Sequence, residues 1–139
     1  MKILIDTNVM LDFLTKRKPY YDAAKSVIAG CTAGIAEGYI AAHSVINSFY
    51  ILRKDYTPEQ RRAILKDFLT LVKVVGIDAT MISRSLLRED FPDYEDCLQS
   101  ECAAECSAEY IITRNISDFE NSVVTPLSPE QFLKMIRNM

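Results

Sequence analysis

A short apolar run near the start of the chain, Ile3 to Ile5, constrains the fold more strongly than any other feature. Its β-branched residues suit a strand that is buried on both faces of a parallel sheet. The run ends abruptly in Asp6-Thr7-Asn8. At the carboxyl end of a central parallel strand, a carboxylate faces the crevice in which open α/β sheets bind ligands. Asp6 is therefore expected to point into a site, although Asp6 and Asn8 are also residue types that cap a helix.

Strand-like and helix-like segments alternate along the rest of the chain. Further strands are predicted at residues 38–42, 72–77, 110–113 and 122–124. Helices are predicted at residues 9–15, 20–31, 44–54, from 58, at 78–87, 94–108 and from 129, with Ser44 and Thr57 as caps. This alternation implies a parallel sheet with right-handed crossovers and helices on both faces. The predicted fold class is α/β, a three-layer α/β/α arrangement around a central parallel sheet of about five short strands.

Length and composition fit a single domain over residues 1–139. A chain of 139 residues that is 49% hydrophobic can bury one proper core. No apolar run approaches the roughly 18 residues of a membrane span, and nothing marks the chain for export. The four cysteines lack the separated pairs of a disulfide framework, so we expect a cytoplasmic protein. The net charge of −3 argues against binding nucleic acid through a bulk positive field, but it permits a local basic rim.

A second group of acids lies far along the chain. Glu95 and Asp96 open a predicted helix, and a later strand ends in Thr113-Arg114-Asn115 with Asp118 beyond. In a parallel sheet these segments open on the edge that carries Asp6. Carboxylates gathered in this way raise one another's pKa or require a counter-cation, and oxygen ligands suit Mg²⁺ or Mn²⁺. Such an ion activates a water and neutralises the charge that develops on a phosphodiester as it is cut.

The sequence gives little support for nucleophilic catalysis, zinc binding or nucleotide binding. His43 is the only histidine and has no obvious nucleophile beside it, so it is interpreted as an ordinary helix-start residue. Cys102 and Cys106 lack a second ligand pair, so they are interpreted as reduced, structural cysteines and not as zinc ligands. There is no glycine-rich phosphate loop. Arg114 is the best cation to hold a substrate phosphate, because it adjoins the predicted site.

Three blocks of the sequence together resemble the PIN-domain nuclease family. They are Ile3-Leu4-Ile5-Asp6-Thr7-Asn8, Asp93-Tyr94-Glu95-Asp96 and Tyr110 to Phe119, in that order, and the resemblance covers essentially the full chain. It implies a Mg²⁺- or Mn²⁺-dependent endoribonuclease that cleaves RNA with a metal-activated water. For a free-standing domain of this size it also implies a VapC-like toxin of a prokaryotic toxin–antitoxin pair. The implied partners are an RNA substrate, an antitoxin protein and a second copy of the chain.

The resemblance also assigns roles to individual residues. Asp6, Asp96 and Asp118 are the expected metal ligands. Two positions depart from the family, because Asn47 stands where many members carry a glutamate and Asn115 where many carry an aspartate. Fewer charges imply weaker metal binding, which Glu95 could offset. The expected catalytic residues are Asp6, Asp96, Asp118, Asn47 and Glu95, and the expected supporting residues are Thr7, Asn8, Thr113, Arg114 and Asn115.

Two other functions stay open at this point. One is a PIN-like RNA-binding or scaffold protein with a weakened or lost active site, in which Asn47 and Asn115 stand in place of catalytic acids. Binding of Mn²⁺ separates this protein from a nuclease. The other is a housekeeping RNA-processing nuclease, which a neighbouring gene for a small antitoxin would argue against.

Overall fold

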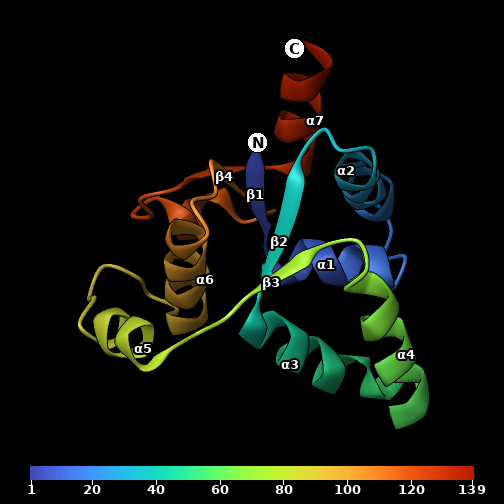
Figure 1. Cartoon of the computed structure of the whole chain (residues 1–139), viewed down its shortest axis with the longest axis horizontal. Helices are drawn as coiled ribbons and strands as arrows, with labels where there is room; N and C mark the ends of the chain where they lie inside the picture. The colour runs from blue at the N-terminus through green and yellow to red at the C-terminus, as the bar shows by residue number, and fades with distance from the viewer.

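Strand β1 (Lys2–Ile5) lies at the centre of a five-stranded sheet in which every pair of neighbours is parallel (Figure 1). The computed structural model describes all of residues 1–139. The strand order is β3-β2-β1-β4-β5, and Ile3 of β1 pairs with Gly38 on one side and Tyr110 on the other. The remaining strands are β2 (Glu37–Ala41), β3 (Lys73–Val75), β4 (Tyr110–Ile112) and β5 (Thr125–Leu127).

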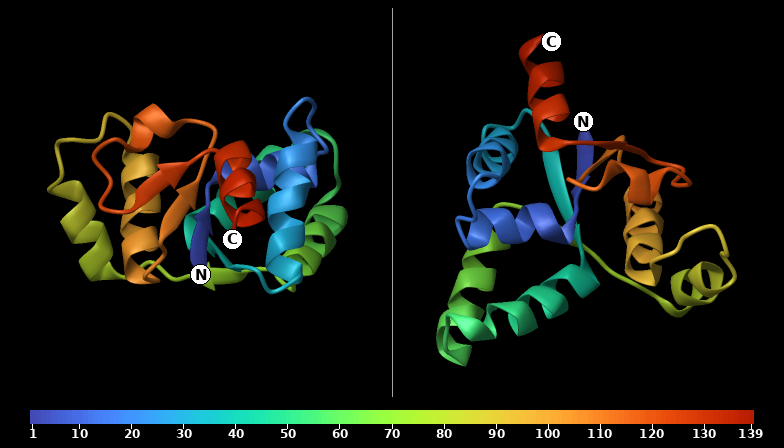
Figure 2. Two further views of the ribbon diagram at one scale, coloured as in Figure 1. Left: turned by 90° about the horizontal axis from the view of Figure 1, so that it is seen from above. Right: turned by 180° about the vertical axis from the view of Figure 1, so that it is seen from behind.

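Helices cover both faces of this sheet, so the predicted three-layer α/β/α fold is confirmed (Figures 1 and 2). Two short 3₁₀ helices, η1 (Leu52–Lys54) and η2 (Ile116–Phe119), complete the structure. None of the helices is long and apolar enough to cross a bilayer. The seven α-helices are α1 (Thr7–Leu14), α2 (Tyr21–Thr32), α3 (Ala42–Ile51), α4 (Pro58–Phe68), α5 (Ala79–Leu86), α6 (Tyr94–Glu105) and α7 (Pro129–Arg137).

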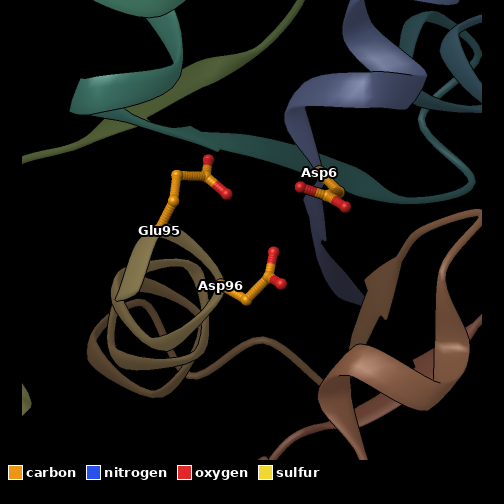
Figure 3. A group of neighbouring side chains, drawn as sticks. All are labelled: Asp6, Glu95 and Asp96. Atoms are coloured by element: carbon orange, nitrogen blue, oxygen red, sulfur yellow. The ribbon is translucent and has the colours of Figure 1, made fainter. Parts of the chain in front are cut away.

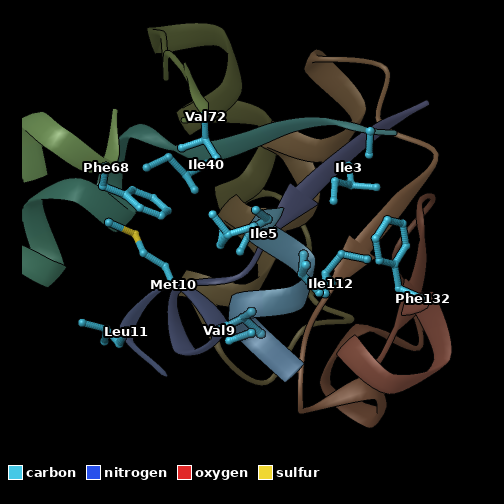
Figure 4. Packing of buried hydrophobic residues seen from close by; sticks show 14 of the residues in the cluster. Ile3, Ile5, Val9, Met10, Leu11, Ile40, Phe68, Val72, Ile112 and Phe132 are labelled. Carbon is cyan, nitrogen blue, oxygen red and sulfur yellow. The ribbon is translucent and has the colours of Figure 1, made fainter. Parts of the chain in front are cut away.

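The alternation of side chains along β1 divides the core into two parts. Ile3 and Ile5 face the larger part, which α1, α2, α4 and α7 close (Figure 4). Leu4 faces the opposite side and packs with residues of α5 and α6. Small residues such as Cys102 and Ala103 let α6 lie close against the sheet. Because β1 is buried on both faces, its carboxyl end is held rigidly between the two layers.

The structure corrects two of the sequence-based boundaries. The last strand lies at Thr125–Leu127, three residues after the predicted Ser122–Val124. Val123 is 83% exposed, and the Ser122 hydroxyl bonds to Ser100 and to the N–H of Val124, so this stretch forms a loop. The strand that replaces it contains Pro126, which a sheet tolerates at its edge because no ladder hydrogen bond is lost there.

The second correction concerns Ser44, which was expected to cap the third helix. Helix α3 begins two residues earlier, at Ala42, and Ala41 precedes it without a side-chain cap. Ser44 is fully buried inside the first turn, where its hydroxyl bonds to side chains of other helices. By contrast, Thr57 caps α4 as predicted and forms a capping box with Gln60.

Candidate metal centre

Asp6 lies at the carboxyl end of β1, where the chain turns into α1. Its Oδ1 accepts a hydrogen bond from the N–H of Thr7 at 2.8 Å, and its Oδ2 accepts one from the Thr113 hydroxyl at 2.8 Å. The side chain is only 4% exposed, yet it lines an open pocket. The two sequence interpretations are therefore compatible, because Asp6 caps α1 and faces a site at once. Each carboxylate oxygen keeps a lone pair free for a ligand.

The amino terminus of α6 brings two further acids to the same place. Asp93 caps this helix through the N–H of Glu95, and Glu95 and Asp96 occupy its first turn. Unpaired N–H groups and the helix dipole favour negative charge at such a position. One carboxylate oxygen from each of Asp6, Glu95 and Asp96 lies within 4.8 Å of the others. Figure 3 shows the three carboxylates directed into one common space.

Electrostatics make this arrangement costly without a cation. Burial and the charge of Glu95 raise the pKa of Asp6 to about 6, against the opposing effect of the hydrogen bonds from Thr113 and Thr7. Burial, with the charges of neighbouring acids led by Asp6, raises the pKa of Asp96 to about 7. The chain supplies no hydrogen-bond donor and no basic partner to Asp96, and both burial and the neighbouring acids raise its pKa. A divalent cation would relieve this repulsion.

Glu95 differs from the other two acids because its charge is well supported. Its Oε1 accepts hydrogen bonds from His43 Nε2 at 3.0 Å, Gln99 Nε2 at 3.0 Å and the Thr7 hydroxyl at 3.1 Å. Burial raises its pKa, but these hydrogen bonds, led by those from His43 and Gln99, outweigh burial and leave the pKa below its usual value. Glu95 is therefore a carboxylate at neutral pH.

The surrounding pocket has a volume of about 410 Å³ and collects most of the residues that the sequence predicted. Asp118 lines it but is exposed and stands outside the group of three close carboxylates, in which Glu95 is found instead. Thr113 is fully buried and does not line the pocket, but its hydroxyl donates a hydrogen bond to Asp6. The predicted residues that line the pocket are Asp6, Thr7, Asn8, Asn47, Glu95, Asp96, Asn115 and Asp118.

Arg114 has partners other than a substrate. Its Nε donates to Asp12 at 2.7 Å, and its guanidinium lies 3.9 Å from the centre of the Tyr20 ring. Asp12 is buried and has two cationic partners, Arg114 at 2.7 Å and Arg17 at 3.6 Å, so Arg114 is part of a buried ion pair. Arg114 does not line the pocket, whereas Arg17, which the sequence did not single out, does.

Sequence reasoning also missed His43 and Gln99. His43 was interpreted as an ordinary helix-start residue, yet its ring contacts a carboxylate of the candidate centre. Gln99 is completely buried on α6, one helical turn after Glu95. A glutamine four residues after a glutamate, on a helix whose buried residues are mostly small, is the one signal that could have indicated this contact.

Charge repulsion in the centre predicts how the metal-free protein responds to pH. The folded-state pKa values of Asp6 and Asp96 lie above the ordinary value of 3.8, so the folded chain binds more protons than the unfolded chain between about pH 4 and pH 7. The stability that these groups contribute is full below pH 4 and is lost as pH rises through about 7.

Replacing Asp96 by asparagine should therefore stabilise the metal-free protein at pH 8. We expect Asp96→Asn to raise the thermal midpoint by roughly 3–6 °C in the presence of a chelator. The exposed Asp118→Asn variant is the matched control and should leave the midpoint nearly unchanged. A midpoint for Asp96→Asn at or below that of the wild type would show that the carboxylates do not strain the fold.

Comparisons with known proteins agree with this fold. A family profile described as PIN domain matches residues 2–117. The fold is similar to VapC20 of Mycobacterium tuberculosis, described as a sarcin–ricin loop cleaving toxin, with a TM-score of 0.71 and 16% identity over 91% of this chain and 99% of that chain. A chain of a toxin–antitoxin complex from Klebsiella pneumoniae gives a TM-score of 0.68 and 22% identity, over 91% and 97%. VapBC-1 from nontypeable Haemophilus influenzae gives 0.68 and 16%, over 94% and 99%. A search of curated proteins finds no match in sequence.

Proposed function

The chain belongs to the PIN-domain family, and from this premise we propose that it is a divalent-metal-dependent endoribonuclease, the toxin of a toxin–antitoxin pair. The observation that carries the proposal is the convergence of Asp6, Glu95 and Asp96, with oxygens within 4.8 Å of one another and no basic partner for Asp96. A structural cluster of acids would be paired with cations. In this one Glu95 contacts His43, but Asp6 and Asp96 form no salt bridge with any basic side chain although they line an open pocket.

The donor set fits Mg²⁺ or Mn²⁺, which prefer carboxylate oxygens and retain several waters. Asp6, Asp96 and Glu95 are the residues that would hold the ion, and Asp118 and Asn47 line the same pocket. When bound, the ion would lower the pKa of a water and neutralise charge on the scissile phosphate. Thr113 and the N–H of Thr7 keep the Asp6 carboxylate in one orientation throughout.

The pocket wall also offers groups that suit a single-stranded nucleic acid. Arg17 lines the pocket with a side chain that is 44% exposed, at 3.6 Å from Asp12, and it can meet a phosphate beside the acids. Tyr50 is 61% exposed on the same wall, with the Arg53 guanidinium 3.7 Å from its ring centre. The unpaired bases of a single strand can stack on such aromatic and guanidinium planes, whereas the bases of a duplex are already stacked on one another.

The products of cleavage test the proposed chemistry. We expect the purified protein to cut single-stranded RNA with Mn²⁺ or Mg²⁺ and to lose activity in a chelator. Because water is the proposed nucleophile, an RNA with a single 2′-deoxynucleotide at the scissile position should still be cut. Mass spectrometry of the fragments should show no 2′,3′-cyclic phosphate. Cyclic phosphate, or undiminished cleavage in the chelator, would contradict a metal-dependent hydrolysis.

The antitoxin is proposed to dock between α3 and α4. A largely apolar groove of about 510 Å³ lies there, bordered by the cations Arg62 and Lys66. Amphipathic partner helices place their apolar face into grooves of this kind, and the basic border favours an acidic one. A gene for a small acidic partner beside this one would support a toxin over a housekeeping nuclease. The apolar lining residues are Val45, Ile46, Phe49, Leu65 and Leu69.

A second function is favoured by one observation, the neutral side chains at Asn47 and Asn115 in the pocket. They are consistent with a PIN-like protein that binds RNA without cutting it. Calorimetric titration with Mn²⁺ separates the two functions, because only the nuclease requires an ion in the centre.

A further inference from the structure

The Glu95 carboxylate uses its two oxygens differently. Oε1 accepts three hydrogen bonds, from Thr7, His43 and Gln99, whereas no group of the chain donates to Oε2. In Figure 3 the carboxylate turns toward Asp6 and Asp96. One oxygen is thus fixed by the protein, and the other remains free to bind a cation in the shared space.

The side-chain amide of Gln99 contacts three other polar side chains. Its Nε2 lies 3.0 Å from Glu95 Oε1, 2.9 Å from the Thr7 hydroxyl and 2.8 Å from the Ser44 hydroxyl. These contacts join three helices, because Thr7 belongs to α1, Ser44 to α3 and Gln99 to α6. The three side chains meet beside Asp6, which directly precedes Thr7. The Gln99 amide therefore links Glu95 to α1 and α3, and this contact fixes the orientation of the Glu95 carboxylate.

Stability alone does not explain why these polar groups are buried. Gln99 is fully buried, and its Oε1 has no hydrogen-bond partner. The Nδ1 of His43 is also buried without a partner. Because a carboxylate only accepts hydrogen bonds, His43 Nε2 must carry the proton. Each orphaned atom costs free energy, and an apolar side chain in either place would avoid that cost. The contact that both residues share is a donor directed at Glu95, and Gln99 also contacts Thr7 and Ser44.

We propose that Gln99 and His43 are positioning residues, which hold Glu95 turned into the metal centre as the third carboxylate where α3 presents the neutral Asn47. The inference rests on the proposed metal centre. Outer residues that orient a ligand change metal affinity by roughly 10- to 100-fold when they are removed. Gln99 and His43 should therefore affect Mn²⁺ affinity only through Glu95.

The test is a double-mutant cycle on Mn²⁺ affinity, measured by calorimetric titration of the purified full-length protein. Gln99→Met keeps the length of the side chain but removes its donors. We expect it to weaken Mn²⁺ binding about tenfold in the wild type and less than twofold in a Glu95→Gln background. His43→Leu should behave in the same way, and His43→Gln, which restores a donor near Nε2, should recover most of the affinity.

Ser100→Ala provides the matched control. Ser100 is also buried on α6, but it bonds to Ser122, away from the centre. This variant should lose stability without losing Mn²⁺ affinity. If Gln99→Met does not fold, the comparison of His43→Leu with His43→Gln decides the question, because the His43 side chain is 14% exposed whereas Gln99 is completely buried.

The outcomes distinguish this inference from the proposed function. If the wild type does not bind Mn²⁺, the metal centre and the positioning role both fail. If the wild type binds Mn²⁺ but Gln99→Met and His43→Leu bind equally well, only the positioning role fails. If both variants weaken binding by the same factor in the wild-type and in the Glu95→Gln background, they act on the whole fold and not through Glu95, which also overturns the inference.

Discussion

The Asp6→Asn variant should lose at least roughly a thousandfold in its rate of RNA cleavage while keeping its fold. Asp6 is the acid most firmly fixed in the centre, between the N–H of Thr7 and the hydroxyl of Thr113. Asparagine retains an oxygen to cap α1, so the helix should survive. The substitution removes the negative charge, and with it the strongest reason for a cation to bind there.

Cleavage of a labelled single-stranded RNA at saturating Mn²⁺ measures this effect, and circular dichroism checks the fold. Asp118→Asn is the matched control, since Asp118 lines the pocket but stands outside the three close carboxylates. We expect that variant to lose only about tenfold, the lower end of the range for residues that act on a metal indirectly. Cleavage by Asp6→Asn at a rate near that of the wild type would remove Asp6 from the chemistry.

Mn²⁺ affinity should fall by roughly a hundredfold or more between pH 8 and pH 5. The pKa values of Asp6 and Asp96 are raised to about 6 and about 7, so protons compete with the metal for both carboxylates across this range. Affinity should be highest above pH 7, where both groups are ionised, and should decrease with increasing steepness as both become protonated. The two acids repel each other, so the observed midpoints belong to the pair.

Calorimetric titration at several pH values measures this dependence. Repeating the titration in buffers of different ionisation enthalpy gives the number of protons released when Mn²⁺ binds. The Asp96→Asn variant should bind more weakly at pH 8 and show a shallower dependence, because only one of the two perturbed carboxylates remains. An affinity that is the same at pH 5 and pH 8 would contradict the assignment of these carboxylates as ligands.

Local sequence patterns were sufficient to predict most of the fold. The apolar run at Ile3–Ile5 is short, β-branched and ends in Asp6, and it forms the central strand as predicted. Thr57-Pro58 marks the start of α4 because a hydroxyl cap followed by proline acts locally. The edge strand was misplaced because Val123 and Val124 have high strand propensity, while the pairing is decided by the neighbouring strand β4.

The site was predictable only in part, for a related reason. Asp6 and Asp96 could be found because strand ends and helix starts meet at one edge of a parallel sheet. Glu95 and Asp96 are adjacent on a helix, so their side chains leave it in different directions, and sequence alone could not show that both reach the same space. The contacts of His43 with Glu95, of Ser44 with Thr7 and of Gln99 with Ser44 join residues 37 to 55 positions apart in the chain, for which no local pattern exists.

The partner of Arg114 illustrates the same difficulty. Its place directly after β4 made it the best cation to meet a substrate, and it lies close to the predicted edge. The deciding partner was Asp12, a buried acid on α1 whose helical position gave no sign of a need for a cation. Arg17, on the loop after α1, lines the pocket in its place.

Crystals of the protein soaked in Mn²⁺ and measured for anomalous scattering offer the most direct test of the metal centre. Our proposal predicts one strong peak at about 2.1 Å from carboxylate oxygens of Asp6 and Asp96, with Glu95 oriented toward it. In crystals of Asp6→Asn the peak should be absent or greatly reduced. No peak at this edge of the sheet, or a peak bound only by residues outside the three carboxylates, would contradict the proposed centre.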